Sequence, residues 1–250
     1  MLEISGLSAG YGKLHVIENL DLSIPTGRRV AIFGRNGAGK STLVNTILRT
    51  VDTYGGDMRW NGHSLRRMRT EKVVRLGVGL VPQSRGLFYH QTVEENLRLG
   101  AYHAGVSRQV VYERIDQMFT RFPALAARRA LLSSSLSGGE QQMLAIAKVL
   151  MRTPKLLLLD EPSIGLAPRM IQQVAEAVRS VEGDDLTLLI TEQNVEYVLP
   201  LVDEAHILEQ GRIVKTFSSA DGGIDKTTIL HEYLGGGSLK QPVNGTGPTT

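Results

Sequence analysis

Cysteine is absent from this chain of 250 residues. The absence excludes a disulfide framework and thiolate chemistry, and it is consistent with a reducing compartment. Long hydrophobic runs are missing as well: runs such as the one at residues 156–159 are far shorter than the roughly 20 residues that span a bilayer. The first five residues show neither the charged nor the apolar region of a signal peptide. We therefore expect any connection to a membrane to be made through a partner protein.

The chain also has little excess of charge of one sign, since its 28 Lys and Arg residues are nearly balanced by 25 Asp and Glu residues. The densest basic cluster, Arg66-Arg67-Met68-Arg69, is interpreted as a solvated surface, and no nucleic-acid partner is expected. With 42% hydrophobic residues, the composition is that of an ordinary globular protein. The length suffices for one large domain or two small ones with a substantial core.

A glycine-rich stretch fits the phosphate-binding pattern G-x-x-x-x-G-K-[ST] of a P-loop. It runs Gly34-Arg35-Asn36-Gly37-Ala38-Gly39-Lys40-Ser41-Thr42. A short apolar strand is expected before it at residues 29–33, and a helix after it at residues 41–49. Glycines let the backbone N–H groups face a polyphosphate, and the helix N-terminus favours negative charge. Lys40 is expected to reach the β- and γ-phosphates and Ser41 to ligate Mg²⁺, so the chain is predicted to bind a nucleoside triphosphate.

A continuous apolar strand at residues 156–159 ends in two acids, Asp160 and Glu161. Continuous apolarity indicates burial on both faces, and therefore a central strand of a parallel sheet. Asp160 is expected to hold Mg²⁺ beside the P-loop, directly or through water. Glu161 could polarise the attacking water as a general base, which is typically worth about 10²- to 10⁴-fold in rate. Two acids that merely end a strand are the weaker alternative, because buried carboxylates are costly without a cation or hydrogen bonds.

A second glycine-rich segment, Ser137-Gly138-Gly139-Glu140, has the spacing of a helix-opening capping box. Such a helix N-terminus also suits an anion. The chain thus holds two phosphate-binding half-sites but one P-loop, and this segment is expected on a separate helical lobe. A two-fold or pseudo-two-fold dimer would let each helix tip cover the partner's γ-phosphate, so that ATP controls the interface. A well-capped helix with small residues explains the segment about as well, and both interpretations stay open.

Two further residues are candidates for which spacing alone decides nothing. Tyr11 lies between Gly10 and Gly12 in an expected loop, where it could stack on adenine or be a half-buried surface tyrosine. Gln83 follows a buried strand at residues 78–81, and ligands gather at this end of strands in open parallel sheets. The alternative for Gln83 is an ordinary loop glutamine.

The patterns together predict an α/β fold. We expect a P-loop NTPase core with a mainly parallel sheet, an N-terminal antiparallel β-subdomain and an inserted α-helical subdomain. One nucleotide-binding domain is expected over residues 1–234, with its core at 1–84 and 153–234 and the helical subdomain at 85–152. A last helix is expected to end at Leu234-Gly235, and residues 235–250 are expected to form a disordered tail.

These motifs occur together in the order and spacing of one family. They are Tyr11, residues 34–42, Gln83, Leu136-Ser137-Gly138-Gly139-Glu140-Gln141-Gln142 and residues 156–162. Over about residues 2–234 the sequence resembles the ATPase subunit of an ABC transporter, and Leu-Ser-Gly-Gly-Glu-Gln is highly specific for that family. The resemblance implies that Tyr11 stacks on adenine, that Gln83 couples Mg²⁺ and water to the permease, and that Glu161 is the catalytic base. It also implies that Ser137, Gly138 and Gly139 contact the γ-phosphate of the partner chain.

A closer resemblance is to the shorter of the two ATPases of branched-chain amino-acid, amide and urea importers. Residues 137–148, 160–168 and 192–194 carry it. It implies ATP and Mg²⁺ as ligands, integral-membrane permease subunits as partners and a solute-binding protein as an indirect partner. It also implies a second ABC ATPase subunit, for which we favour a longer sister chain over a second copy. The implied location is peripheral, at the cytoplasmic face of the cell membrane.

Two positions depart from the general ABC pattern in the way that this subfamily does. Ala167 stands where many relatives have an aspartate that contacts the opposite monomer, and Gln193 stands where most have a histidine that touches the γ-phosphate. A glutamine can hydrogen-bond a phosphate but cannot carry a proton or charge. Gln193 therefore motivates one alternative, a nucleotide-gated regulatory module with little turnover. A soluble ABC protein acting on DNA, ribosomes or iron–sulfur assembly is another, although no accessory segment fits between the motifs.

Overall fold

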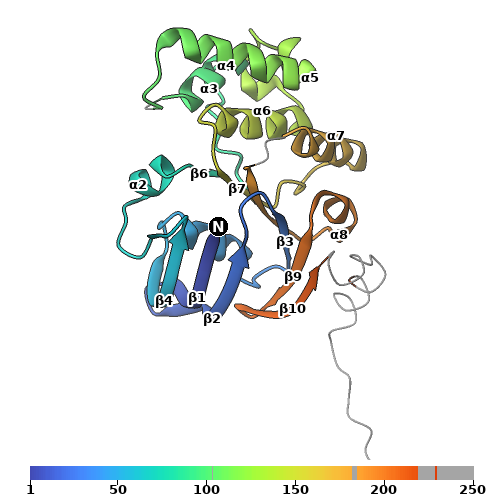
Figure 1. Ribbon diagram of the computed structural model, residues 1–250. Coiled ribbons are helices and arrows are strands. Elements are labelled where there is room, and N and C mark those ends of the chain that lie inside the picture. The colour runs from blue at the N-terminus through green and yellow to red at the C-terminus, as the bar shows by residue number, and fades with distance from the viewer. Residues whose placement is uncertain (103, 182–184, 219–228, 230–250) are drawn as a thin grey trace, which may run out of the picture.

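The computed structural model describes residues 1–102, 104–181, 185–218 and 229. Within them, the strands form one antiparallel and one mainly parallel sheet, and a group of helices stands apart from both sheets (Figure 1). The expected last helix near Leu234-Gly235 and the expected tail at residues 235–250 lie outside the described residues.

The antiparallel sheet comes from the N-terminal part of the chain and has the strand order β2-β1-β4-β5. Its strands are β1 (Leu2–Tyr11), β2 (Leu14–Ile24), β4 (Asp52–Trp60) and β5 (His63–Ser64). β1 and β2 are continuous strands of 10 and 11 residues. Register shifts between Ile4 and Gly10 change which side chains face inward, so the apolar alternation breaks although the strands continue.

The second sheet has the strand order β10-β9-β3-β8-β7-β6 and is parallel except for the hairpin of β9 and β10. Its strands are β3 (Arg29–Phe33), β6 (Val78–Val81), β7 (Leu156–Asp160), β8 (Thr187–Glu192), β9 (Glu204–Glu209) and β10 (Arg212–Ser218). Every residue of β7 and β8 is buried, as expected for central parallel strands. The predicted α/β fold class is confirmed.

Helices α3 to α6 form the inserted helical lobe, which stands above the sheets in Figure 1. The helices are α1 (Lys40–Ile47), α2 (Thr70–Arg75), α3 (Val93–Gly100), α4 (Arg108–Arg121), α5 (Pro123–Ala126), α6 (Gly138–Leu150), α7 (Pro168–Arg179) and α8 (Val195–Val198), with 3₁₀ turns at Ser133–Ser135 and Leu199–Leu201. Thr92 and Ser137 cap α3 and α6 with the reciprocal hydrogen bonds of a capping box. The capping box predicted at Ser137 is confirmed.

The P-loop helix α1 is packed between the two sheets. Its side chains Leu43, Val44 and Ile47 are buried in one apolar cluster with residues of β1, β2 and β4 on one side and of β3, β7 and β8 on the other. A second cluster joins the other face of the parallel sheet to α3, α4, α6 and α7. Because α1 is held from both sides, the direction of its N-terminus is fixed, and that N-terminus carries the P-loop lysine.

A buried histidine in β9 makes the stability of this fold depend on pH. His206 is 5% exposed, and burial lowers its pKa to about 4. Its Nδ1 lies 2.8 Å from the Thr216 hydroxyl, while its Nε2, 3.1 Å from a Glu204 carboxylate oxygen, makes no hydrogen bond. His206 therefore takes up a proton near pH 6.5 in the unfolded chain but only near pH 4 in the folded chain. The free energy of unfolding consequently decreases as the pH falls from about 6.5 towards 4.

We expect the free energy of unfolding to be about 2 kcal/mol lower at pH 5 than at pH 8 on account of His206. Denaturant unfolding at both pH values measures this difference. His206→Asn removes the titrating group and should flatten the pH dependence, whereas His63→Asn, at an exposed position of β5, should leave it unchanged. A His206→Asn variant with the full pH dependence would assign the acid sensitivity to other groups.

Candidate nucleotide-binding site

The P-loop connects the end of β3 to the start of α1 in a conformation that needs glycine. Gly37 and Gly39 have φ angles of +80° and +107°, and a Cβ atom at Gly39 would lie 2.8 Å from the Ile17 side chain. A turn closed by the hydrogen bond from the Ala38 N–H to the Arg35 carbonyl (3.1 Å) directs the loop into α1. The first N–H groups of a helix have no acceptor within it, so this tight turn offers donors to an anion.

A cavity of about 230 Å³ lies in front of the P-loop. It is lined by P-loop residues between Asn36 and Thr42 and by Val16, Gln83 and Glu161. The structure thus brings Gln83, from the loop after β6, and Glu161, from the end of β7, to the P-loop. Both residues follow carboxyl ends of strands in the parallel sheet, where ligands collect in open α/β folds.

Lys40 is buried at the centre of this site, with only 4% of its surface exposed. Its Nζ donates hydrogen bonds to the carbonyl oxygens of Gly34 (2.7 Å) and Arg35 (3.1 Å), and it lies 2.8 Å from Glu161 Oε1 in a buried ion pair. An ammonium group has three donors, so these contacts use all of them. To contact a phosphate, Lys40 must exchange at least one of these partners, and such an exchange would free the Glu161 carboxylate.

The carboxyl group of Asp160 is held by two hydroxyl groups. Its Oδ1 accepts hydrogen bonds from Thr191 Oγ1 (2.7 Å) and Ser41 Oγ (3.1 Å). Burial raises the pKa of Asp160, so a cation beside the carboxylate would offset the cost of its charge. Among the described residues, no cluster of three or more His, Cys, Asp or Glu could hold a metal. One carboxylate and a hydroxyl suit Mg²⁺, which binds few protein ligands and completes its shell with phosphate oxygens and water.

Glu161 and Gln193 are brought together from the ends of neighbouring strands. Glu161 has a φ angle of 46°, and its N–H donates to the Thr191 carbonyl of β8 (2.9 Å). Gln193 Nε2 lies 3.4 Å from each Glu161 carboxylate oxygen and also donates to the side chain of Asn36 in the P-loop. The three residues expected to be catalytic, Lys40, Glu161 and Gln193, therefore share one network of contacts.

Glu192 is a functional candidate that the sequence analysis missed. Its carboxylate accepts hydrogen bonds from the Ser163 N–H (2.8 Å), the Gln193 N–H (2.9 Å) and the Tyr197 hydroxyl (2.6 Å). Burial raises the pKa of Tyr197, which keeps its donor proton in place. Glu192 thus fixes the backbone that follows Glu161 to the backbone that carries Gln193. A second acid at the end of a neighbouring buried strand was the available signal.

The two open candidates differ in their position. Gln83 lines the cavity in front of the P-loop, whereas Tyr11 does not, as far as the described residues define that cavity. Tyr11 was expected in a loop, and this expectation is wrong: it is the last residue of β1, pairs with Leu14 and is 52% exposed. The tight β1–β2 hairpin keeps Tyr11 in the strand, because the chain turns only between Tyr11 and Leu14. The Tyr54 hydroxyl stabilises this hairpin by donating to the Gly12 carbonyl (2.9 Å).

Ser137, Gly138 and Gly139 begin α6 on the helical lobe, away from the P-loop. In the described part of the chain, none of the three lines the P-loop cavity. The Ser137 hydroxyl accepts the Glu140 N–H (3.3 Å), and Glu140 in turn accepts the Ser137 N–H (2.8 Å). Cβ positions at Gly138 and Gly139 would lie 3.1 Å from the side chains of Leu166 and Met170, so the helix tip packs closely against the core. The two segments predicted to bind phosphate therefore lie apart in the described part of the chain.

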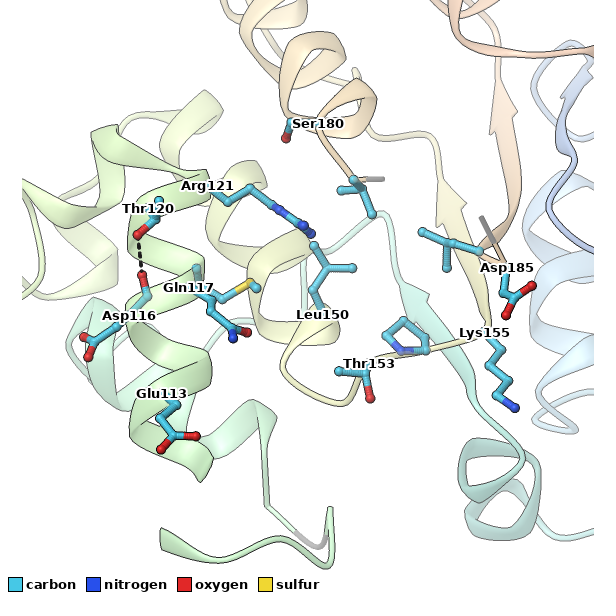
Figure 2. A pocket seen from close by; sticks show the side chains of 14 residues that line it. Glu113, Asp116, Gln117, Thr120, Arg121, Leu150, Thr153, Lys155, Ser180 and Asp185 are labelled. Carbon is cyan, nitrogen blue, oxygen red and sulfur yellow. Dashed lines mark hydrogen bonds between the residues drawn. The ribbon is translucent and has the colours of Figure 1, made fainter. Parts of the chain in front are cut away.

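A larger cavity, of about 1140 Å³, lies elsewhere and contains none of the predicted site residues (Figure 2). Glu113, Asp116 and Arg121 of α4 line one side of it, and Lys155 and Asp185, before β7 and β8, line the other. It therefore opens at the amino ends of β7 and β8, opposite the edge where the P-loop, Asp160 and Gln193 gather. Size alone does not mark this cavity as a ligand site.

A mainly parallel sheet with a P-loop and two acids at its carboxyl edge defines a P-loop nucleoside triphosphatase. The match of the ABC transporter family to residues 17–164 is more specific. The chain is 38% identical to the high-affinity branched-chain amino acid transport ATP-binding protein BraG of Pseudomonas aeruginosa, over 94% of this chain and 100% of the relative. The chain belongs to the ABC transporter family, and it is an ATP-binding subunit of the ATPase type.

A second relative agrees with this assignment, and a solved structure agrees with the fold. The chain is 36% identical to the probable branched-chain amino acid transport ATP-binding protein LivF of Archaeoglobus fulgidus, over 85% of this chain and 90% of the relative. The fold is similar to that of cbiO1 from Clostridium perfringens, part of the ABC transporter complex cbiONQ, with a TM-score of 0.80, 24% identity and coverage of 93% and 94%. No helix among the described residues is long and apolar enough to cross a membrane.

Proposed function

We propose that this chain is the ATP-hydrolysing subunit of an importer for branched-chain amino acids or for related solutes such as urea and amides. The observation that carries the proposal is the 38% identity to a branched-chain amino acid transport ATP-binding protein along its whole length. The buried network of Lys40, Glu161 and Gln193 supports turnover rather than nucleotide sensing alone, because a carboxylate stands directly beside the phosphate-binding lysine.

We propose the following roles in binding. The P-loop backbone from Gly34 to Thr42 holds the phosphates, and Lys40 exchanges a carbonyl or Glu161 for the β- and γ-phosphate oxygens. Ser41, Gln83 and Asp160 hold Mg²⁺, either directly or through water. Mg²⁺ held there would neutralise part of the phosphate charge. Tyr11, exposed at the end of β1, is proposed to stack on adenine.

In hydrolysis, Glu161 is proposed as the general base. Once Lys40 has turned to a phosphate, the Glu161 carboxylate is free to accept a proton from the attacking water. The side-chain amide of Gln193 donates to Asn36 of the P-loop and towards the Glu161 carboxylate. It can therefore hold this carboxylate in place or donate to the γ-phosphate. Glu192 fixes the backbone of both segments and is proposed as a positioning residue.

The working assembly is proposed to be a dimer of ABC ATPase subunits. Ser137, Gly138 and Gly139 are separate from the P-loop of their own chain, and they would cover the γ-phosphate held by the partner. We favour a longer sister ATPase as the partner over a second copy of this chain. The subunit would lie peripherally at the cytoplasmic face of the cell membrane, and a solute-binding protein would be an indirect partner; no nucleic acid is expected.

An apolar groove supports a permease as the further partner. A cavity of about 440 Å³ lies between the core and the helical lobe, and Leu80, Phe88, Leu99 and Val149 line it. Phe88 and Leu99 are 50% and 39% exposed, and Lys148 also lines the groove. An exposed apolar groove beside a cation suits a short cytoplasmic helix of the permease that carries an acidic residue. The loop with Gln83 begins beside it, at Pro82.

Co-purification in detergent tests the proposal. The chain is expressed together with any permeases and second ATPase found to be encoded beside its gene, and recovery of a polytopic permease is the expected result. Leu99→Glu places a carboxylate in the apolar groove, where it would occupy the cation Lys148 in place of an acidic residue of the permease. It should lower permease recovery at least about tenfold while ATP binding is retained. Leu131→Glu, at another exposed position of the lobe, is the matched control. A wild-type chain that never recovers a permease contradicts the importer.

A further inference from the structure

The loop that follows Gln83 is bonded along the length of α6. Near the start of the helix, Arg85 Nη1 donates to Gln141 Oε1 at 2.6 Å. Near its end, Lys148 Nζ donates to the Gly86 carbonyl at 2.6 Å and lies 4.1 Å from the centroid of the Phe88 ring. These contacts hold the loop against α6. Gln83, two residues before Arg85, nevertheless lines the P-loop cavity.

Arg85 holds a backbone conformation that its neighbours must stabilise. Its φ angle is 66°, in the left-handed region, and its N–H closes a turn on the Pro82 carbonyl (2.8 Å). A residue other than glycine persists in such a conformation only where surrounding contacts fix it. The Gln141 contact is such a constraint, and a guanidinium donor makes it one of the stronger types of hydrogen bond.

Gln141 links Arg85 to the segment that leads into the tip of α6. While its Oε1 accepts Arg85, its Nε2 donates to the carbonyl oxygens of Ser133 and Leu136, each at 3.2 Å. Leu136 directly precedes Ser137, the first residue of the tip. The guanidinium group itself lies against the first turn, because a Cβ atom at Gly138 would be 3.5 Å from Arg85 Nη2. The Gln141 side chain thus connects the Gln83 loop with the backbone that leads into Ser137.

A buried amide makes a second connection between the same two segments. Asn96 of α3 is 0% exposed; it accepts the Phe88 N–H (2.9 Å) and donates to the Phe88 carbonyl (3.0 Å). It also donates to the hydroxyl of Ser133 (3.2 Å), which is likewise fully buried. Satisfied polar contacts away from water resist separation, so the loop and the approach to α6 are held as one unit.

We propose that Arg85 is a positioning residue for ATP hydrolysis: through Gln141 it sets the place of the Ser137–Gly139 tip relative to the Gln83 loop. The inference rests on the proposed function, in which Gln83 serves the nucleotide of its own chain and the tip serves that of the partner. Arg85 then fixes the position of the residue that serves one site of a dimer relative to the tip that serves the other site. Its loss leaves each half-site intact and disturbs their relative placement.

Turnover and nucleotide affinity of Arg85→Ala, Gln141→Ala and the double variant test this role. We expect kcat to fall about tenfold in each single variant, a loss typical of one charge-assisted hydrogen bond. ATP affinity, measured on the chain with a fluorescent ATP analogue, should stay within about twofold, because no P-loop contact changes. The double variant should be no slower than either single one, since both remove the same interaction. Arg85→Lys keeps a cationic donor and should recover part of kcat.

Arg108→Ala is the matched control, because Arg108 of α4 donates to Tyr112 on an exposed surface of the same lobe. Unchanged kcat in Arg85→Ala, additive losses in the double variant, or a loss of ATP affinity equal to the loss of turnover would each overturn the inference. A wild-type chain without ATPase activity, by contrast, would overturn the proposed function itself. The two failures are therefore distinguishable in one set of measurements.

Discussion

Glu161→Gln is expected to lower the steady-state rate of ATP hydrolysis by about 10²- to 10⁴-fold, the contribution typical of a general base. The amide has nearly the shape of the carboxylate but cannot accept a proton from water. The substitution leaves the P-loop backbone, Ser41 and Asp160 unchanged, so ATP binding should persist. Since turnover no longer removes the γ-phosphate, a dimer should accumulate at high ATP, which size-exclusion chromatography measures.

The buried ion pair gives this variant a second, independent signature. Without the Glu161 charge, Lys40 keeps two carbonyl contacts but loses its anionic partner at 2.8 Å, and an uncompensated buried charge is strongly destabilising. A bound phosphate would supply the missing negative charge. ATP should therefore raise the melting temperature of Glu161→Gln more than that of the wild type. Glu176→Gln, an exposed position of α7, is the control, and undiminished turnover in Glu161→Gln would exclude Glu161 as the base.

The parts of the site that the sequence could predict are those coded by contiguous residues. The P-loop needs glycine at Gly37 and Gly39 because both have positive φ angles. This requirement is local to the loop, so the sequence pattern alone indicates it. The strand that ends at Asp160 is equally local, because an uninterrupted apolar run has to be buried on both faces. Parallel strands end at the same edge of their sheet, so Glu161 after β7 and the P-loop after β3 are expected at one edge, with β8 between them.

The contacts that escaped prediction join residues far apart in the chain. Glu192 holds the Ser163 N–H, and Arg85 holds Gln141, across separations of 29 and 56 residues. Nothing in the local pattern of a glutamate or an arginine tells which distant amide it will meet, because that depends on the packing of whole elements. The length of β1 was hidden for a different reason: its register shifts break the alternation from which a strand is inferred.

Two inactive variants of this chain are expected to restore activity when they are mixed. Lys40→Met removes the cation of the P-loop, and Gly138→Asp puts a carboxylate at the tip of α6, where it would repel a phosphate. The glycine has an ordinary φ angle, and the nearest atom to a Cβ there is the end of the flexible Leu166 side chain at 3.1 Å. The capping box of Ser137 and Glu140 is kept, so both variants should fold.

When the chain is purified without a sister ATPase, its partner is a second copy, so each variant alone contains only defective sites, because every composite site uses one P-loop and one tip. In a mixed dimer, however, the intact P-loop of the Gly138→Asp chain faces the intact tip of the Lys40→Met chain. If pairing is random and the sites are independent, an equal mixture should reach about a quarter of wild-type turnover, since half of the dimers carry one of two good sites. ATPase rates of the separate and mixed variants at equal total protein measure this recovery.

Both substitutions in the same chain provide the decisive control. A mixture of that double variant with Gly138→Asp contains no pairing of an intact P-loop with an intact partner tip, so it should stay inactive. Recovery in the first mixture and none in the second would require the nucleotide to be shared between two chains. Undiminished turnover of Gly138→Asp alone would mean that the tip never contacts a phosphate, because a carboxylate at the start of α6 would repel a neighbouring γ-phosphate.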